Sequence, residues 1–157
     1  MADGWKYMKA EDAISGKEGA LYATIDGNIV QVAELKNISA KITKNKSSFK
    51  ALGHRGEQFK ATGWTGTGTM VIHYASSRWS KMMIDYAKNG KDTYFKLQTI
   101  NEDPTSSIGR QTVVLIDVNL DEAEVAKLDV DAEFLDQSMN FTFSDIDMPD
   151  EFSDLNV

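Results

Sequence analysis

The chain of 157 residues contains no cysteine. This absence excludes disulfide bonds, thiolate zinc sites and cysteine nucleophiles, and it suits a reducing compartment. The opening residues, MADGWKYMKAED, lack the apolar core of a secretory signal, and no run of about 18 apolar residues could span a membrane. We therefore expect no membrane partner, and the length favours a single domain over residues 1–157 that folds on its own hydrophobic core.

Histidine is also scarce, with only His54 and His73. His54 has no serine or carboxylate at a recognisable catalytic spacing, and two histidines far apart in the sequence do not make a zinc site. The glycine-rich stretch TGWTGTGTMVIHY (62–74) lacks the lysine that a phosphate-binding loop requires, and it departs from the G-x-G-x-x-G fingerprint. We therefore predict no catalytic residue, no metal, no cofactor and no enzymatic activity.

The glycines of this stretch have another explanation when the residues are taken at a period of two. Gly66, Gly68, Met70 and Ile72 then share one face, and threonines occupy much of the other face. Threonine favours strands, whereas glycine in a strand usually marks a bend or the close approach of another part of the chain. The stretch therefore predicts a bent strand in which glycine relieves crowding.

Further segments alternate in the same way and predict an antiparallel sheet. Asp26-Gly27 suits a two-residue hairpin turn between two runs of residues 19–35. More strands are predicted at residues 38–46, 92–101, 111–120, 127–136 and 139–144. The fold class predicted is mainly β (α+β): an antiparallel β-barrel or sandwich of about seven to eight strands with one flanking α-helix.

The helix is predicted over residues 76–90, where apolar residues recur at helical spacing before Asn89-Gly90 ends the pattern. A stripe of this composition is more often core than a ligand site. We expect it to pack the helix on the sheet through Trp79, Met82, Met83 and Tyr86.

The predicted strand 127–136 alternates strictly between apolar and acidic residues. Leu128, Val130, Ala132 and Phe134 would face inward, whereas Asp129, Asp131 and Glu133 would share the outward face. Three carboxylates on an exposed strand face indicate solvent or a charged partner, because a calcium site needs a tight loop with more oxygen ligands.

Three segments lie outside the predicted elements: an N-terminal arm (1–18), a protruding loop (47–61) and an acidic C-terminal tail (145–157). A loop of about 15 residues inside a compact domain is usually functional or mobile. Two interpretations of 47–61 stay open: a surface insertion, or an arm that becomes ordered on a partner.

The charge is distributed unevenly along the chain. Residues 1–116 carry 16 basic and 11 acidic residues, whereas residues 117–157 carry one lysine and 13 acidic residues. Opposed charges on one chain favour head-to-tail contact between copies, which produces rings or open fibres. An unevenly charged solvated surface would explain the same pattern without a partner. Nucleic-acid binding is a weaker interpretation of the basic segment, because aromatic residues are sparse there and the whole chain is acidic.

The order of these parts, and above all the stretches NEDPTSSIGRQTV (101–113) and FTFSDIDMPDEF (141–152), resembles the tail tube proteins of contractile phage tails of the PBSX-like type. The resemblance covers about residues 15–152. It implies a structural subunit that forms stacked hexameric rings around a hollow conduit, in a virion tail assembled in the host cytoplasm. The partners it implies are other copies of the chain, tail sheath, baseplate and tape-measure proteins, with DNA only as passing cargo.

The resemblance also assigns two candidate surfaces. The ring-stacking arm would carry a set of mostly basic residues: Lys44, Lys46, Lys50, His54, Arg55 and Lys60. The acidic face of Asp129, Asp131 and Glu133 would lie in the lumen or at a ring seam. A bacteriocin tail fits the sequence as well as a phage tail does. The sequence also allows a tube of the type VI secretion kind or a small-ligand-binding β-barrel.

Overall fold

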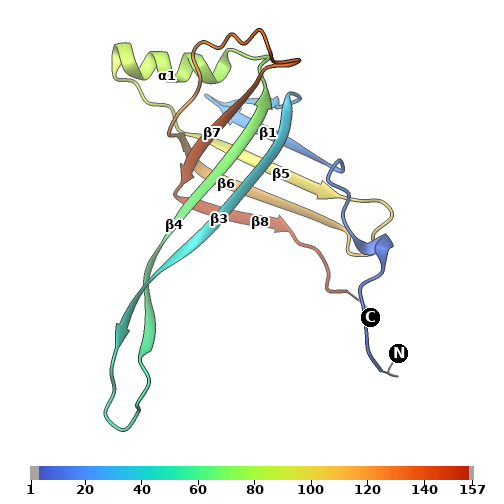
Figure 1. Cartoon of the computed structure of the whole chain (residues 1–157), viewed down its shortest axis with the longest axis vertical. Coiled ribbons are helices and arrows are strands. Elements are labelled where there is room, and N and C mark those ends of the chain that lie inside the picture. Colours follow the sequence, from blue (N-terminus) through green and yellow to red (C-terminus); the bar gives the residue numbers. More distant parts are fainter. Residues whose placement is uncertain (1–3, 156–157) are drawn as a thin grey trace. The chain divides into compact units, whose positions relative to one another are not determined.

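The computed structural model describes residues 4–155 and shows eight strands, paired antiparallel, and one α-helix, α1 (Figure 1). The mainly β class with one helix is therefore confirmed. The chain divides into two compact units, one formed by residues of 1–33, 95–116 and 146–157 and the other by residues 34–94 and 117–145. We call them the first and second unit and describe each by itself. No helix within residues 4–155 has the length and apolar character needed to cross a membrane.

The first unit is a sheet in the order β2-β1-β5-β6, with β8 also paired to β6. The predicted Asp26-Gly27 turn is confirmed, because both residues have positive φ and Ile25 pairs with Asn28 across the turn. Leu21, Ala23 and Leu97 lie in its core. The elements are the 3-10 helix η1 (Ala10–Asp12) and the strands β1 (Gly19–Ile25), β2 (Asn28–Gln31), β5 (Phe95–Glu102), β6 (Arg110–Leu120) and β8 (Asp145–Asp150).

The second unit orders its strands β6-β7-β4-β3, since the last residues of β6 continue into it. Met70 and Ile72 of β4 pair with Met139 and Gln137 of β7, and all four side chains are buried. The predicted helix is confirmed and ends at Gly90, whose left-handed conformation terminates it. The remaining elements are β3 (Leu35–Phe49), β4 (Gln58–His73), α1 (Arg78–Asn89) and β7 (Asp136–Phe143).

Strands β3 and β4 are longer than predicted. Residues 47–49 and 58–61, which were expected to belong to a protruding loop, are the paired ends of these strands, and only residues 50–57 form the loop. Gly53 and Gly56 interrupted the sequence pattern, and the flanking residues are exposed, so no apolar face marked these strand ends. Residues 145–150, expected in an acidic tail, form β8.

The prediction of a strand over residues 127–136 is wrong. Strand β7 begins at Asp136, and residues 121–135 form a loop without regular structure. Leu128, Val130 and Phe134, which were expected to face inward, are 97%, 98% and 80% exposed. The alternation of apolar and acidic residues is real, but in a single chain it places no side chain in a core.

The glycines of β4 make room for aromatic rings. Gly66 pairs with Phe143 and Gly68 with Phe141 across the β4–β7 ladder, and both phenylalanine side chains are buried. A Cβ atom at position 68 would overlap the Phe141 ring and lie 2.8 Å from the backbone oxygen of Ser39. The prediction that these glycines relieve crowding is therefore confirmed.

We predict that Gly68→Ala destabilises the protein by about 1–3 kcal/mol, because the added methyl group must displace a buried ring and a backbone oxygen. The measurement is the urea unfolding midpoint. Gly63→Ala is the matched control: its Cβ would meet nothing within 4 Å, so its midpoint should stay at or slightly above that of the wild type. Equal midpoints for the two variants would contradict this account of the glycines.

Candidate functional site

The most exposed feature of the second unit is a two-stranded ribbon formed by the ends of β3 and β4 (Figure 1). The pairing of β4 with β7 ends at Gly66, so residues 58–65 pair only with β3. Residues 43–49, 50–57 and 58–65 together are called the ribbon. An isolated two-stranded hairpin is marginally stable in water, so this ribbon lacks the support that a third strand or a packed face would supply.

The predicted arm residues all lie on this ribbon and are all exposed. Lys44 and Lys46 lie on β3, Lys60 lies on β4, and the others lie in the connecting loop. The four lysines and Arg55 form no salt bridge with residues 4–155. The His54 Nδ1 atom lies 2.9 Å from the Gly56 carbonyl oxygen, which fixes a turn at the tip. The ribbon therefore carries positive charge without an internal counterion.

Large apolar side chains accompany these charges. Phe49 and Phe59 near the ends of the two strands are 49% and 64% exposed, and Leu52 in the loop is fully exposed. Nothing in the sequence pattern assigned these three residues to a surface. The tip of the ribbon is thus both basic and apolar, which is typical of a surface that another molecule covers.

A second exposed surface lies at the other end of the second unit, in the loop 121–135 between β6 and β7 (Figure 1). Two hydrogen bonds fix the first part of the loop: Ser80 Oγ donates to the Glu124 carbonyl oxygen (2.7 Å), and the Glu124 N–H donates to Gln137 Oε1 (3.1 Å). Two more hydrogen bonds fix the last part of the loop. Lys127 Nζ donates to the Asp136 carbonyl oxygen (2.7 Å), and the Tyr74 N–H donates to the Leu135 carbonyl oxygen (2.9 Å). The loop is held at both ends.

Residues 128–134 between these anchors are exposed except for the half-buried Ala132, and we call them the acidic loop. The predicted site residues Asp129, Asp131 and Glu133 are exposed there and form no salt bridge with the described part of the chain. Asp129 Oδ1 accepts a hydrogen bond from the Asp131 N–H (3.0 Å), which makes a local turn. The structure brings the three carboxylates together on a loop instead of a strand face.

The predicted helix-packing residues differ in their burial. Trp79 is fully buried and Met82 and Met83 are half-buried, whereas Tyr86 is 54% exposed. The packed face of α1 therefore ends before its last turn, and Tyr86 is available to solvent in the single chain. The Arg78 guanidinium lies 5.6 Å from the centroid of the Trp79 ring and forms a salt bridge with Glu34 (3.3 Å).

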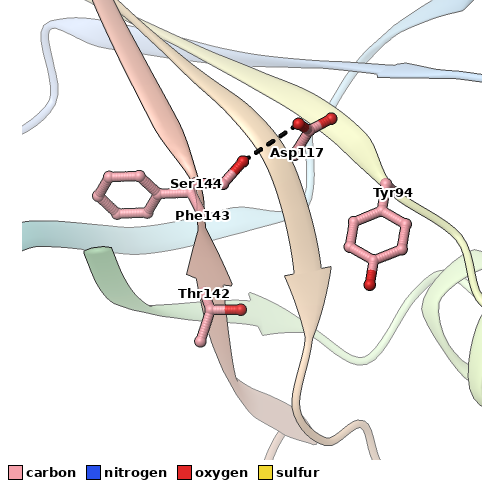
Figure 2. A pocket seen from close by; sticks show the side chains of 5 residues that line it. All are labelled: Tyr94, Asp117, Thr142, Phe143 and Ser144. Carbon is pink, nitrogen blue, oxygen red and sulfur yellow. Dashed lines mark hydrogen bonds between the residues drawn. The ribbon is translucent and has the colours of Figure 1, made fainter. Parts of the chain in front are cut away.

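A hollow of about 430 Å³ lies beside the end of β7 and offers little chemistry (Figure 2). Its lining residues are Tyr94, Asp117, Thr142, Phe143 and Ser144. Ser144 Oγ donates a hydrogen bond to Asp117 Oδ2 (3.1 Å), so the one carboxylate there already has a partner. Within residues 4–155 no group of three histidine or acidic side chains could hold a metal ion.

In the first unit, the stretch NEDPTSSIGRQTV (101–113) holds both terminal segments. Asp12 Oδ1 accepts hydrogen bonds from the Ser107 hydroxyl (2.7 Å) and N–H (3.0 Å). Asp103 accepts them from the N–H groups of Ser15 (2.9 Å) and Thr105 (3.0 Å). On the C-terminal side, the Thr112 hydroxyl donates to Asp150 Oδ2 (2.8 Å). The polar residues of this stretch thus fix Asp12 and Ser15 to the loop between β5 and β6, and β8 to β6.

These hydrogen bonds favour the ionised carboxylates. The Ser107 hydroxyl and then its N–H lower the pKa of Asp12, and the N–H groups of Ser15 and Thr105 lower the pKa of Asp103. In the second unit, a hydrogen bond from Lys36 (2.8 Å), with a further contribution from His73 at 3.1 Å, lowers the pKa of Asp136. All three side chains serve the fold, and none has the surroundings of a catalytic acid or base.

The model of one protein family, described as "Phage tail tube protein", matches residues 6–150. The chain belongs to the phage tail tube protein family. The tail tube chain is 43% identical over 147 residues to the "Phage-like element PBSX protein XkdM" of Bacillus subtilis (strain 168). This match covers 94% of the tail tube chain and 97% of the relative. The family is a structural one, so this tail tube protein is not an enzyme.

Solved structures share the fold of this tail tube protein at low sequence identity. A chain of the anti-feeding prophage (AFP) baseplate, 6-fold symmetrised, is 12% identical with a TM-score of 0.66, over 87% of this chain and 94% of that chain. A chain of the PVC sheath-tube complex of an extracellular contractile injection system in its extended state is 8% identical with a TM-score of 0.64. The match covers 88% of this chain and 93% of that chain.

The carboxylates of the first unit give the tail tube protein a specific acid sensitivity. Because their pKa values are lower in the folded chain than in the unfolded chain, Asp12 and Asp103 add stability that is complete above about pH 4 and lost as pH falls through their folded-state pKa values. We predict that Asp103→Asn lowers the urea midpoint at pH 7 and flattens its decline between pH 4 and pH 2.

Urea midpoints at a series of pH values measure this effect. Asp26→Asn is the matched control in the same unit, because asparagine suits the positive φ of that turn as well as aspartate does. Its midpoint at pH 7 should match that of the wild type. An Asp103→Asn profile that runs parallel to the wild-type profile down to pH 2 would show that this carboxylate does not stabilise the fold.

Proposed function

We propose that this chain is the structural subunit of a contractile tail tube: copies close into six-fold rings, and the rings stack into a hollow conduit. The observation that carries the proposal is the ribbon, which extends beyond the sheet of its own chain and requires a second molecule to cover it. The family, and the fold shared with a 6-fold symmetrised baseplate chain, support the same conclusion.

Ring closure would use the free edge of β3. This strand of 15 residues has one hydrogen-bonded neighbour, β4, within the described chain. Such an edge is a template for pairing with another copy, and lysines along it, among them Lys41, Lys44 and Lys46, discourage uncontrolled pairing between single chains. In a closed ring the unpaired backbone groups of β3 find partners in every subunit, because each subunit offers the next one a surface to pair with.

Ring stacking would use the ribbon as the arm that reaches the next ring. Its lysines and Arg55 form no salt bridge within residues 4–155, and the acidic half of the sequence would supply their counterions on a neighbour. The further partners in this proposal are sheath, baseplate and tape-measure proteins, with DNA as passing cargo and assembly in the host cytoplasm. Likeness to a sheath-tube chain supports the sheath as a partner.

The assembly itself is the first prediction of this proposal. The purified protein at high concentration and low salt should form rings or long hollow rods in negative-stain electron micrographs. Raising the salt concentration should reduce their number, because screening weakens attraction between exposed charges. A protein that stays monomeric by sedimentation at every concentration and salt level would contradict the proposal.

A second prediction concerns the ribbon. Asn45 and Gly63 are paired across it, so residues 46–62 can be replaced by an Asp-Gly turn that closes the shortened hairpin. The core contains no side chain from this segment, and the thermal unfolding of this variant should stay cooperative. We expect no stacked rods in micrographs. Rods of wild-type length and frequency would refute the assignment of the ribbon as the stacking arm.

A further inference from the structure

We infer that the acidic loop of one subunit is the surface on which the ribbon of the next copy docks. This inference rests on the proposed function and names the two surfaces that meet when subunits stack. It assigns Asp129, Asp131 and Glu133 to the contact between rings instead of the lumen.

The two surfaces lie at opposite ends of the second unit (Figure 1). Strand β4 starts at Gln58 in the ribbon and ends at His73, which pairs with Asp136 directly after the loop 121–135. The 16 residues of β4 therefore place the tip of the ribbon, next to Gln58, about 50 Å from the end of the strand that adjoins the loop 121–135. Because the surfaces differ and lie at opposite ends, a contact between them is heterologous, and such a contact can repeat from copy to copy along one direction.

Their charges are complementary. Residues 41–60 carry six basic residues against Glu57 alone, and residues 121–135 carry six acidic residues against Lys127 alone. Lys127 already lies 3.5 Å from Glu124, so it leaves Asp129, Asp131 and Glu133 without a cation. Each surface thus has an excess of unpaired charge that the other can neutralise.

Both surfaces also expose apolar side chains close to their charges. Leu128, Val130 and Phe134 are neighbours in sequence of the carboxylates of the acidic loop, with exposed fractions of 80% or more. Phe49, Leu52 and Phe59 stand between the cations of the ribbon. Scattered exposed apolar residues are ordinary, but three on one short loop form a patch that a partner would cover. A partner that pairs the carboxylates must be basic, and the ribbon is both basic and apolar.

The acidic loop is prepared for a partner because its two ends are fixed. Hydrogen bonds at Glu124 and Leu135 hold it to α1, β7 and the end of β4, while residues 128–131 and 133–134 between them are exposed. Holding a segment in place before binding reduces the entropy lost on association. The ribbon, in contrast, gains its missing packing on contact with the acidic loop.

Disulfide trapping tests the inference directly, since the chain has no cysteine of its own. The variant Leu52→Cys/Val130→Cys places one thiol on the ribbon and one on the acidic loop, both at exposed positions. The rods are assembled with reductant and then oxidised, and the protein is analysed on a denaturing gel without reductant. We expect a ladder of covalently linked chains, because each chain would join one neighbour through each thiol.

The matched control is Leu52→Cys/Ile29→Cys, in which the second thiol lies at an exposed position of β2. It should give dimers at most. A Leu52→Cys/Val130→Cys variant that forms rods without a ladder, or with a ladder no longer than that of the control, would overturn the inference and leave the tube function intact. Absence of rods from the wild-type chain would instead overturn the proposed function.

Charge reversal gives a second test that does not depend on thiols. Reversing the acidic loop (Asp129→Lys, Asp131→Lys and Glu133→Lys) should abolish rods at low salt, while thermal unfolding stays cooperative. Adding Lys44→Glu, Lys46→Glu and Lys50→Glu to the same chain should restore rods. Rods that persist after reversal of the loop alone would place the acidic loop against the sheath or the lumen and overturn the inference.

Discussion

The structure depends on one constraint: a β-ribbon cannot bury its own faces. Residues 43–49 and 58–65 pair with each other and with no other strand of the described chain, because β7 reaches only as far as Gly66. A hairpin of this kind is marginal in water unless a third element covers it. The buried core of the second unit ends at the same place, where Phe143 packs against Gly66. The ribbon beyond that point is exposed in the single chain. The proposed assembly of tail tube proteins into a tube would explain this exposure, because another molecule would cover the ribbon there.

The folded core is therefore determined by close packing, whereas the exposed surfaces are determined by charge. In the core, a glycine opposite a phenylalanine ring at positions 68 and 141 sets the fit between β4 and β7, and a single added methyl group would disturb it. On the surface, cations are in excess on the ribbon and carboxylates on the acidic loop, and neither group forms a salt bridge within residues 4–155. The net charge of −7 opposes uncontrolled association of such a chain, and under the proposed function its missing contacts come from copies of itself.

Much of the fold could be predicted from the sequence, because local chemistry decides it. Asp26-Gly27 specifies a hairpin turn, Gly90 ends a helix, and alternation around Met70 marks a strand with one buried face. The errors occur where the sequence pattern is not matched by burial within the described chain. Leu128, Val130 and Phe134 alternate as in a strand, yet no core of their own chain receives them. The strand ends 47–49 and 58–61 were missed for the converse reason, since both faces of the ribbon are exposed and no apolar periodicity marks them. The basic and acidic residues of the candidate surfaces were visible as charge, but their placement at opposite ends of β4 required the structure.

The central claim is that other copies of the chain cover the ribbon. Amide hydrogen exchange, measured residue by residue in dispersed protein and in assembled rods, tests it most directly. The account predicts rapid exchange across residues 43–49 and 58–65 in the dispersed chain, because a marginal hairpin opens often, and markedly slower exchange in the rods. The buried strand residues 68–73 should exchange slowly in both states. Equal exchange of the ribbon amides in dispersed and assembled protein would contradict the claim.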